Sequence, residues 1–163
     1  MCGITGFFDL ELTASPENIL LGMTNALIHR GPDDSGLWFD GPIALGHRRL
    51  SILDLSPAGH QPMMSACGRY VMVFNGEIYN HQTLRTEFER SAALPAGGWR
   101  GHSDTETILA YLAVLGFESM LKATVGMFAL VLWDRSERCL YLARDRLGEK
   151  PLYYGWQKNA FLF

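Results

Sequence analysis

The residue of this sequence best suited to chemistry is a cysteine at position 2. Removal of Met1 would leave Cys2 with a thiol and a free α-amino group in a single residue. In unperturbed peptides these groups titrate at about pH 8.5 and about pH 8, so modest local electrostatics supply a nucleophile and a base near neutrality. The glycine-rich, apolar segment 3–8 predicts a buried strand directly after Cys2. An ordinary residue near a frayed chain end is the alternative interpretation.

A thiolate that attacks an amide carbonyl builds negative charge on oxygen, and preorganised donors must meet that charge. The dipeptide Asn75-Gly76 offers two such donors, the Asn75 side-chain amide and the Gly76 backbone N–H. We predict that the apolar strand over residues 70–74 ends at this dipeptide, so that both donors point to one spot. Asn-Gly between apolar stretches is also a strong hairpin signal, and this alternative stays open.

Two further patches suit the charged ends of a free amino acid. Arg48 and Arg49 are adjacent on a predicted strand and point to opposite faces, so at most one enters a pocket, where it would clamp a carboxylate. Asp104 opens a predicted helix, where it either complements the helix dipole or accepts a substrate ammonium. A nucleophile, oxyanion donors, a carboxylate clamp and an ammonium acceptor together suit hydrolysis of the side-chain amide of a free amino acid. Their proximity does not follow from their spacing.

Composition excludes several other classes of protein. The 163 residues fit one domain, with 48% hydrophobic and 19% charged residues, and a net charge of −3 without basic clusters argues against nucleic-acid or anionic-membrane surfaces. We expect a cytoplasmic chain without a signal peptide or membrane span. Three cysteines without CxxC spacing and five scattered histidines predict no disulfide framework and no metal site.

The pattern of apolar residues predicts the elements that must position these groups. Pro16 after Ser15 begins a helix through Leu27, and the capping-box sequence Ser103–Glu106 begins another that stops at Gly116, before a short helix over 117–123. Strands are predicted at 4–8, 36–39, 43–53, 70–74, 127–133, 139–143, 152–156 and 160–163. Many strands with helices grouped between them indicate an α+β fold. Large apolar residues at 161–163 suggest a chain cut from a longer one.

Six strings in this order carry a resemblance to a known family: Cys2-Gly3-Ile4, His29-Arg30-Gly31-Pro32-Asp33, Arg49-Leu50-Ser51-Ile52-Leu53-Asp54, Asn75-Gly76-Glu77-Ile78-Tyr79-Asn80, Ser103-Asp104-Thr105-Glu106 and Arg144-Asp145-Arg146-Leu147-Gly148. Over essentially all 163 residues the sequence resembles the N-terminal glutaminase domain of glutamine-hydrolysing asparagine synthetases. These are class II glutamine amidotransferases, which are N-terminal-nucleophile hydrolases.

The resemblance implies a four-layer αββα sandwich of two mainly antiparallel sheets and a set of roles. Cys2 would be the nucleophile with its own amine as base, and Asn75 with the Gly76 N–H would form the oxyanion hole. Arg49 would hold the glutamine carboxylate, and Glu77 and Asp104 would hold the ammonium. The backbone of residues 50–53, including Leu50, Ile52 and Leu53, would line the pocket.

The resemblance also implies what lies elsewhere. Residues 1–163 would form the amidotransferase domain, truncated at its C-terminus, with no cofactor of its own. ATP, Mg²⁺ and aspartate chemistry would belong to a synthetase domain that this sequence lacks, since no glycine-rich phosphate loop is present. Two alternatives stay open: an amidotransferase for a sugar carboxylate in surface-polysaccharide synthesis, and a catalytically silent docking module. The sequence does not reveal the oligomeric state, and a homodimer is one of the partner expectations.

Overall fold

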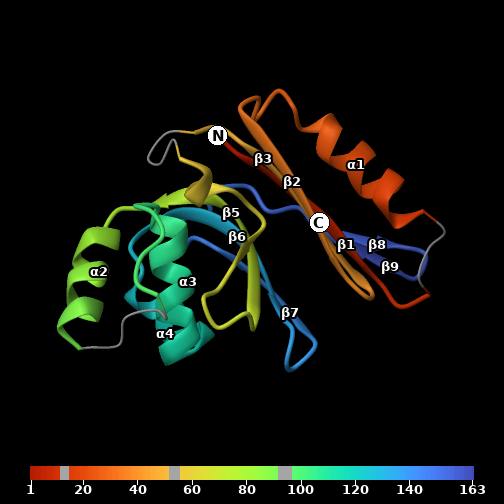
Figure 1. The fold of residues 1–163 in the computed structure, drawn as a ribbon. Coiled ribbons are helices and arrows are strands. Elements are labelled where there is room, and N and C mark those ends of the chain that lie inside the picture. Colours follow the sequence, from red (N-terminus) through yellow and green to blue (C-terminus); the bar gives the residue numbers. More distant parts are fainter. Residues whose placement is uncertain (12–14, 52–55, 92–96) are drawn as a thin grey trace.

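Two antiparallel sheets stacked face to face organise the computed structural model, which describes residues 1–11, 15–51, 56–91 and 97–163 (Figure 1). The first sheet has the strand order β2-β3-β1-β9-β8, and the second has the order β4-β5-β6-β7. All pairings between these strands are antiparallel. The first sheet contains β1 (Gly3–Asp9), β2 (Asp34–Asp40), β3 (Ile43–Arg49), β8 (Gly155–Gln157) and β9 (Ala160–Leu162); the second contains β4 (Met63–Met64), β5 (Tyr70–Ile78), β6 (Gly126–Asp134) and β7 (Cys139–Arg144).

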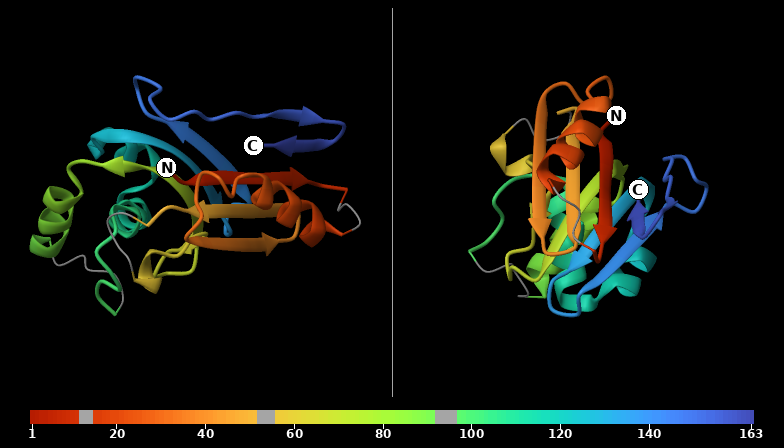
Figure 2. Two further views of the ribbon diagram at one scale, coloured as in Figure 1. Left: turned by 90° about the horizontal axis from the view of Figure 1, so that it is seen from above. Right: turned by 90° about the vertical axis from the view of Figure 1, so that its right-hand side faces the viewer.

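Helices cover the outer face of each sheet. Helix α1 (Pro16–Ala26) packs on the first sheet, whereas α2 (His81–Arg90), α3 (Asp104–Leu115) and α4 (Phe117–Ala123) lie together on the second (Figures 1 and 2). A short 3₁₀ turn, Pro57–Gly59, precedes β4. The layer order is therefore helix, sheet, sheet, helix, and the α+β fold and four-layer αββα sandwich predicted for this sequence are confirmed.

Three apolar clusters hold the four layers together, because each sheet buries side chains on both faces. Phe7, Leu20 and Ala44 join α1 to the first sheet. The cluster between the two sheets consists of Ile43, Leu45, Val71, Val73, Val131 and Trp133. The largest cluster joins the second sheet to its helices: Met63, Met72, Phe74, Ile78, Leu84, Ile108, Leu109, Leu112, Met120, Phe128, Leu130 and Leu132.

Strand β5 corrects a prediction that matters for the site. Its pairing with β6 runs without interruption from Tyr70 opposite Asp134 to Ile78 opposite Gly126. Asn75 and Gly76 therefore lie inside the strand, and the predictions of a strand end or a hairpin turn at this dipeptide were wrong. Nine paired residues outweigh the local turn preference of Asn-Gly.

Other boundaries differ for similar reasons of pairing. The strand predicted over 43–53 ends at Arg49, because its neighbour β2 begins at Asp34, the residue opposite Arg49. The strand predicted from residue 152 starts at Gly155, where pairing with β9 begins.

Helix α2 was not predicted, because its polar sequence buries only one side, at Leu84, Arg85 and Phe88. None of the described helices combines the length and apolar character that crossing a membrane requires.

Candidate active site

One pocket of about 140 Å³ gathers the predicted site residues from separate elements. Cys2, Arg49, Leu50, Asn75, Gly76, Glu77 and Asp104 all line it. They come from the start of β1, the end of β3, the C-terminal half of β5 and the start of α3. Ile52 and Leu53, predicted to contribute backbone groups, lie outside the described residues. The pocket also has walls that were not predicted, formed by Met1, Gly59, Gln61, Phe74, Ser103, Thr105, Met127 and Lys150.

Cys2 is held from both sides at the entrance to β1. Its Sγ donates a weak hydrogen bond to the carbonyl oxygen of Leu50 at 3.8 Å. The Arg30 Nε donates to the Cys2 carbonyl oxygen at 3.2 Å. Because β1 pairs with β3 from Gly3 onward, the residue before it cannot swing freely. The thiol is therefore fixed at the pocket wall rather than on a loose chain end.

Asn75 and Gly76 form the pocket wall contributed by β5. Asn75 is buried, and it lines both the main pocket and an adjoining pocket that Cys2 also lines. A Cβ atom on Gly76 would lie 2.3 Å from the Met127 carbonyl oxygen, so only glycine fits this close approach of β5 to β6. Asn75 and Cys2 thus line the same two pockets, although Asn75 lies in the second sheet and Cys2 precedes β1 of the first.

Side chains, rather than a paired strand, form hydrogen bonds with the backbone of β5 next to Asn75, on the edge beyond β4. The short strand β4 pairs only with residues 71 and 72, so the Phe74 backbone needs other partners. Gln61 Oε1 accepts from the Phe74 N–H at 2.6 Å, and His47 Nε2 lies 3.1 Å from the Phe74 oxygen. Burial lowers the pKa of His47 to about 4, so the ring is neutral and its Nε2–H must be the donor.

The two adjacent arginines separate as predicted. Arg48 points toward α1, where it donates to the Thr24 oxygen at 3.3 Å and to the Asn25 side chain. Arg49 is buried in the pocket wall, and its Nη1 donates to the Ser56 oxygen at 3.1 Å. A Cβ atom on Gly59 would lie 2.0 Å from Arg49 Nη2, so the guanidinium fills the space that a side chain would take.

Asp104 presents a buried carboxylate at the start of α3. Its Oδ2 accepts from the Ile78 N–H at 2.9 Å, and its Oδ1 accepts from the Thr105 N–H at 2.7 Å. Burial raises the pKa of Asp104 despite these hydrogen bonds, because they only partly replace lost hydration. A cationic ligand at this wall would relieve that cost. The side chain is therefore suited to an ammonium group.

Lys150 is the most notable pocket residue that sequence reasoning missed. It is buried, and its Nζ lies 3.3 Å from Met1 Sδ. The N–H groups of Leu147, Glu149 and Lys150, in the loop that ends at this lysine, donate to the Asp145 carboxylate. Burial raises the pKa of Asp145, but N–H donors from Lys150, Glu149, Phe128 and Gly148 outweigh this and lower it overall. Asp145 thus organises the loop through backbone groups rather than through an ion pair with Arg146, which donates instead to the Thr124 oxygen at 3.3 Å. The only sequence signal was the position of Lys150 just beyond the Arg144–Gly148 string.

Comparison with known proteins identifies the family of this chain. The family model described as a glutamine amidotransferase domain matches residues 1–163. The chain is 38% identical to "Asparagine synthetase [glutamine-hydrolyzing] 3" of Bacillus subtilis and to "Asparagine synthetase B [glutamine-hydrolyzing]" of Escherichia coli. Each alignment covers 100% of this chain but only 26% and 28% of those proteins, so the chain spans about a quarter of their length.

A solved structure supports the fold independently of close sequence similarity. The glutamine phosphoribosylpyrophosphate amidotransferase of B. subtilis superposes with a TM-score of 0.79 at 18% identity, over 99% of this chain and 41% of that one. Its likeness concerns the arrangement of sheets and helices alone. With the family model matching from the first residue to the last, and with the pocket that the fold builds around Cys2, this chain belongs to the glutamine amidotransferase domain family.

Proposed function

We propose that this domain hydrolyses L-glutamine to glutamate and ammonia with Cys2 as the nucleophile. The observation that carries the proposal is the single pocket lined by Cys2, Asn75, Gly76, Arg49, Glu77 and Asp104. Each part of glutamine has a suitable partner among these residues. Cys2 suits the amide carbonyl, and Asn75 with Gly76 suits the developing oxyanion. Arg49 suits the carboxylate, and Glu77 with Asp104 suits the ammonium. A docking module has no need for these groups to converge.

The chemistry starts once Met1 has been removed. The freed α-amine of Cys2 takes the thiol proton, and the thiolate attacks the side-chain carbonyl carbon of glutamine. Asn75 Nδ2 and the Gly76 N–H would stabilise the tetrahedral oxyanion, which collapses to a γ-glutamyl thioester as the amine returns the proton and ammonia leaves. Water then attacks the thioester, which yields glutamate and restores the thiol.

The substrate's charged end would be bound at the opposite pocket wall. Arg49 is suited to the α-carboxylate because a guanidinium fork matches two carboxylate oxygens. Asp104 and Glu77 are suited to the α-ammonium, and the buried position of Asp104 strengthens that interaction. Together these contacts would select a free amino acid over a protein side chain.

The decisive experiment compares cysteine variants of the chain after its N-terminus has been checked by intact mass. Cys2→Ala is expected to lower glutaminase kcat by at least about 10³-fold, because the covalent route is lost. Cys67→Ala and Cys139→Ala are matched controls, since both thiols are exposed and away from the pocket, and each is expected to stay within twofold. Full turnover by Cys2→Ala would refute the mechanism. A fully processed but inactive wild-type chain would instead favour the docking module.

The acceptor of the ammonia is a separate proposal. We propose aspartate, supported by relatives named asparagine synthetases, with ATP and Mg²⁺ used by a synthetase domain joined to this one. A relative of Gibberella zeae named "Amidase chry2", 37% identical over 99% of this chain, carries a different name over a similar domain. Similarity in this domain thus does not identify the acceptor, and the sugar carboxylate named as an alternative on sequence grounds is the rival. Assaying the whole protein for asparagine formation with aspartate and ATP, against candidate sugar acids, distinguishes the two.

Location and assembly are proposed on narrower grounds. Cys2, Cys67 and Cys139 are all free thiols, which suits the reducing cytoplasm. A homodimer stays a prediction that a measurement of mass in solution would test.

A further inference from the structure

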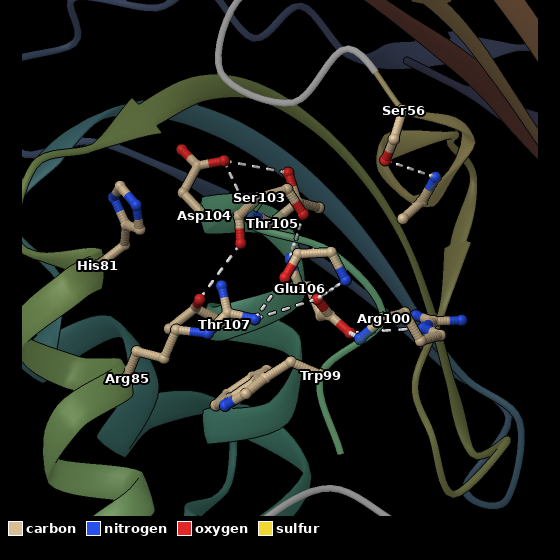
Figure 3. A network of polar contacts seen from close by, with 12 residues as sticks. Ser56, His81, Arg85, Trp99, Arg100, Ser103, Asp104, Thr105, Glu106 and Thr107 are labelled. Carbon is tan, nitrogen blue, oxygen red and sulfur yellow. Dashed lines mark hydrogen bonds and ion pairs between the residues drawn. The ribbon is translucent and has the colours of Figure 1, made fainter. Parts of the chain in front are cut away.

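A buried carboxylate outside the pocket lies two residues from Asp104. Glu106 occupies the first turn of α3 with its side chain 7% exposed, and it does not line the site. Its Oε1 accepts from the Arg100 N–H at 2.8 Å, and its Oε2 accepts from the Gly101 N–H at 3.0 Å (Figure 3). The predicted capping box is therefore only half formed. Ser103 Oγ accepts from the Glu106 N–H at 3.2 Å, but the Glu106 carboxylate binds the preceding loop.

Arg85 of α2 holds the same loop from the other side. Its Nη2 lies 3.4 Å from Glu106 Oε2 and donates to the Gly101 oxygen at 2.6 Å. The Arg85 guanidinium also stacks over the Trp99 ring at 4.0 Å from its centroid, and the Trp99 Nε1 donates to Glu89 at 2.9 Å. The segment 99–101 is thus bound to both helices through buried charge and backbone hydrogen bonds.

This segment leads straight into the pocket wall. The segment is followed by three residues that line the pocket, Ser103, Asp104 and Thr105. Figure 3 shows these residues above Glu106. The Asp104 carboxylate is in turn bound to β5 through the Ile78 N–H. A shift in the approach of the loop would therefore rotate or withdraw Asp104 while leaving Cys2 and Asn75 in place, because those residues come from other elements.

We propose that Glu106, paired with Arg85, is a positioning residue that sets the orientation of Asp104 and hence the affinity for the substrate's ammonium group. The inference rests on the proposed glutaminase function and adds a determinant that no pocket contact reveals. Glu106 touches neither the reacting amide nor the thiol. Its loss therefore weakens binding in the ground state and transition state alike, which raises KM and leaves kcat nearly unchanged.

The test is Glu106→Gln, which keeps the shape of the side chain but turns one acceptor oxygen into a donor facing other donors. We expect KM for glutamine to rise at least tenfold with kcat within threefold of wild type. The milder Arg85→Lys, which loses the guanidinium fork and the stacking on Trp99, is expected to raise KM at least threefold. It replaces Glu106→Gln should that variant fail to fold.

Asp134→Asn is the matched control. Asp134 is equally buried, pairs with Arg69 at 2.7 Å and accepts two backbone N–H groups, but it lies at the hairpin between β6 and β7. It should cost comparable stability without moving KM. The proposal is overturned when Glu106→Gln and Asp134→Asn change KM equally, or when Glu106→Gln lowers kcat while KM stays constant.

A second measurement is independent of activity. Hydrogen exchange of the Ile78 amide reports whether Asp104 stays in place, so it should accelerate at least tenfold in Glu106→Gln and not in Asp134→Asn. Equal exchange in both variants would refute the coupling even where KM changes. Absence of glutaminase activity in processed wild type would refute the proposed function, and the exchange experiment would still decide the positioning role of Glu106.

Discussion

The position of the Arg49 side chain depends on the lack of a side chain at Gly59. Its guanidinium occupies the space beside Gly59, and its direction follows from strand alternation, which sends the neighbouring Arg48 to α1. The observed position of this guanidinium thus requires an arginine at the end of β3 and a residue without a side chain in the 3₁₀ turn. The first was predictable from sequence, but the second was not.

Gly59→Ala tests this dependence. The new methyl group would meet the guanidinium at about 2 Å, far inside van der Waals contact, so Arg49 must move. We expect KM for glutamine to rise at least about tenfold, with a smaller effect on kcat, measured by steady-state kinetics. Gly22→Ala is the control, because nothing lies within 4 Å of its Cβ position in α1 and alanine favours a helix. Unchanged KM in Gly59→Ala would contradict the placement of Arg49.

At the scale of elements, β5 shows where local sequence signals fail. Asn-Gly favours a turn, but the strand continues because β6 pairs with it along its full length. On its other edge, two side chains from the first sheet and the preceding loop, His47 and Gln61, satisfy the backbone of Phe74. The pocket wall that contains Asn75 and Gly76 is therefore a strand interior with side-chain partners, and such partners leave no pattern in sequence.

His47 makes stability depend on pH. Its pKa is about 4 in the folded chain and about 6.5 when unfolded, so between these values the unfolded state binds more protons. Stability is then complete above pH 6.5 and falls as pH drops toward 4, by about 3 kcal/mol at the most from this group. Urea unfolding at pH 4 to 7 should show this slope, and His47→Gln should flatten it. His60→Asn, which leaves His47 intact, should keep it, and an equal slope in His47→Gln would contradict the assignment.

Whether each of the other helices and strands could be predicted depended on the kind of sequence signal it carries. Helices α1, α3 and α4 and the apolar strands were predicted because caps and periodicity are local properties. Helix α2 was missed because its sequence is mostly polar and only Leu84, Arg85 and Phe88 are buried, which leaves little apolar periodicity. The arrangement of Cys2, Arg49, Asn75 and Asp104 followed only from the family resemblance, since four separate elements bring them together and no spacing encodes that meeting. Gln61 carried no sequence signal, and Lys150 carried only its position just beyond the Arg144–Gly148 string.

At the scale of the whole molecule, the two ends of the chain are joined in one sheet. Gly6 and Phe163 exchange backbone hydrogen bonds at 3.0 and 3.1 Å, and Thr5 Oγ1 donates to the Phe163 oxygen at 3.0 Å. The Phe163 ring packs into the space above Gly6 and against the cluster between the sheets. The strand that follows Cys2 is thereby buttressed from both edges.

Phe163→Ala tests that support. Removing a partly buried ring that contacts the cluster between the sheets should lower the free energy of unfolding by about 2 kcal/mol. Trp156→Ala is the matched control, since Trp156 is 70% exposed on the neighbouring strand, and it should cost less than about 0.5 kcal/mol. Chemical denaturation of both variants measures the difference. Equal losses would show that the ring at 163 contributes no more than a surface aromatic.

Met1 lies in the pocket beside Cys2, with Lys150 against its sulfur atom. An affinity tag fused ahead of residue 1 would place its linker in the same space and keep the Cys2 nitrogen in an amide bond. Such a preparation should therefore show no glutaminase activity, even when it is correctly folded. A protease site that leaves the cysteine first restores both groups with one cut. Recombinant production of this domain is therefore also an experiment on its chemistry.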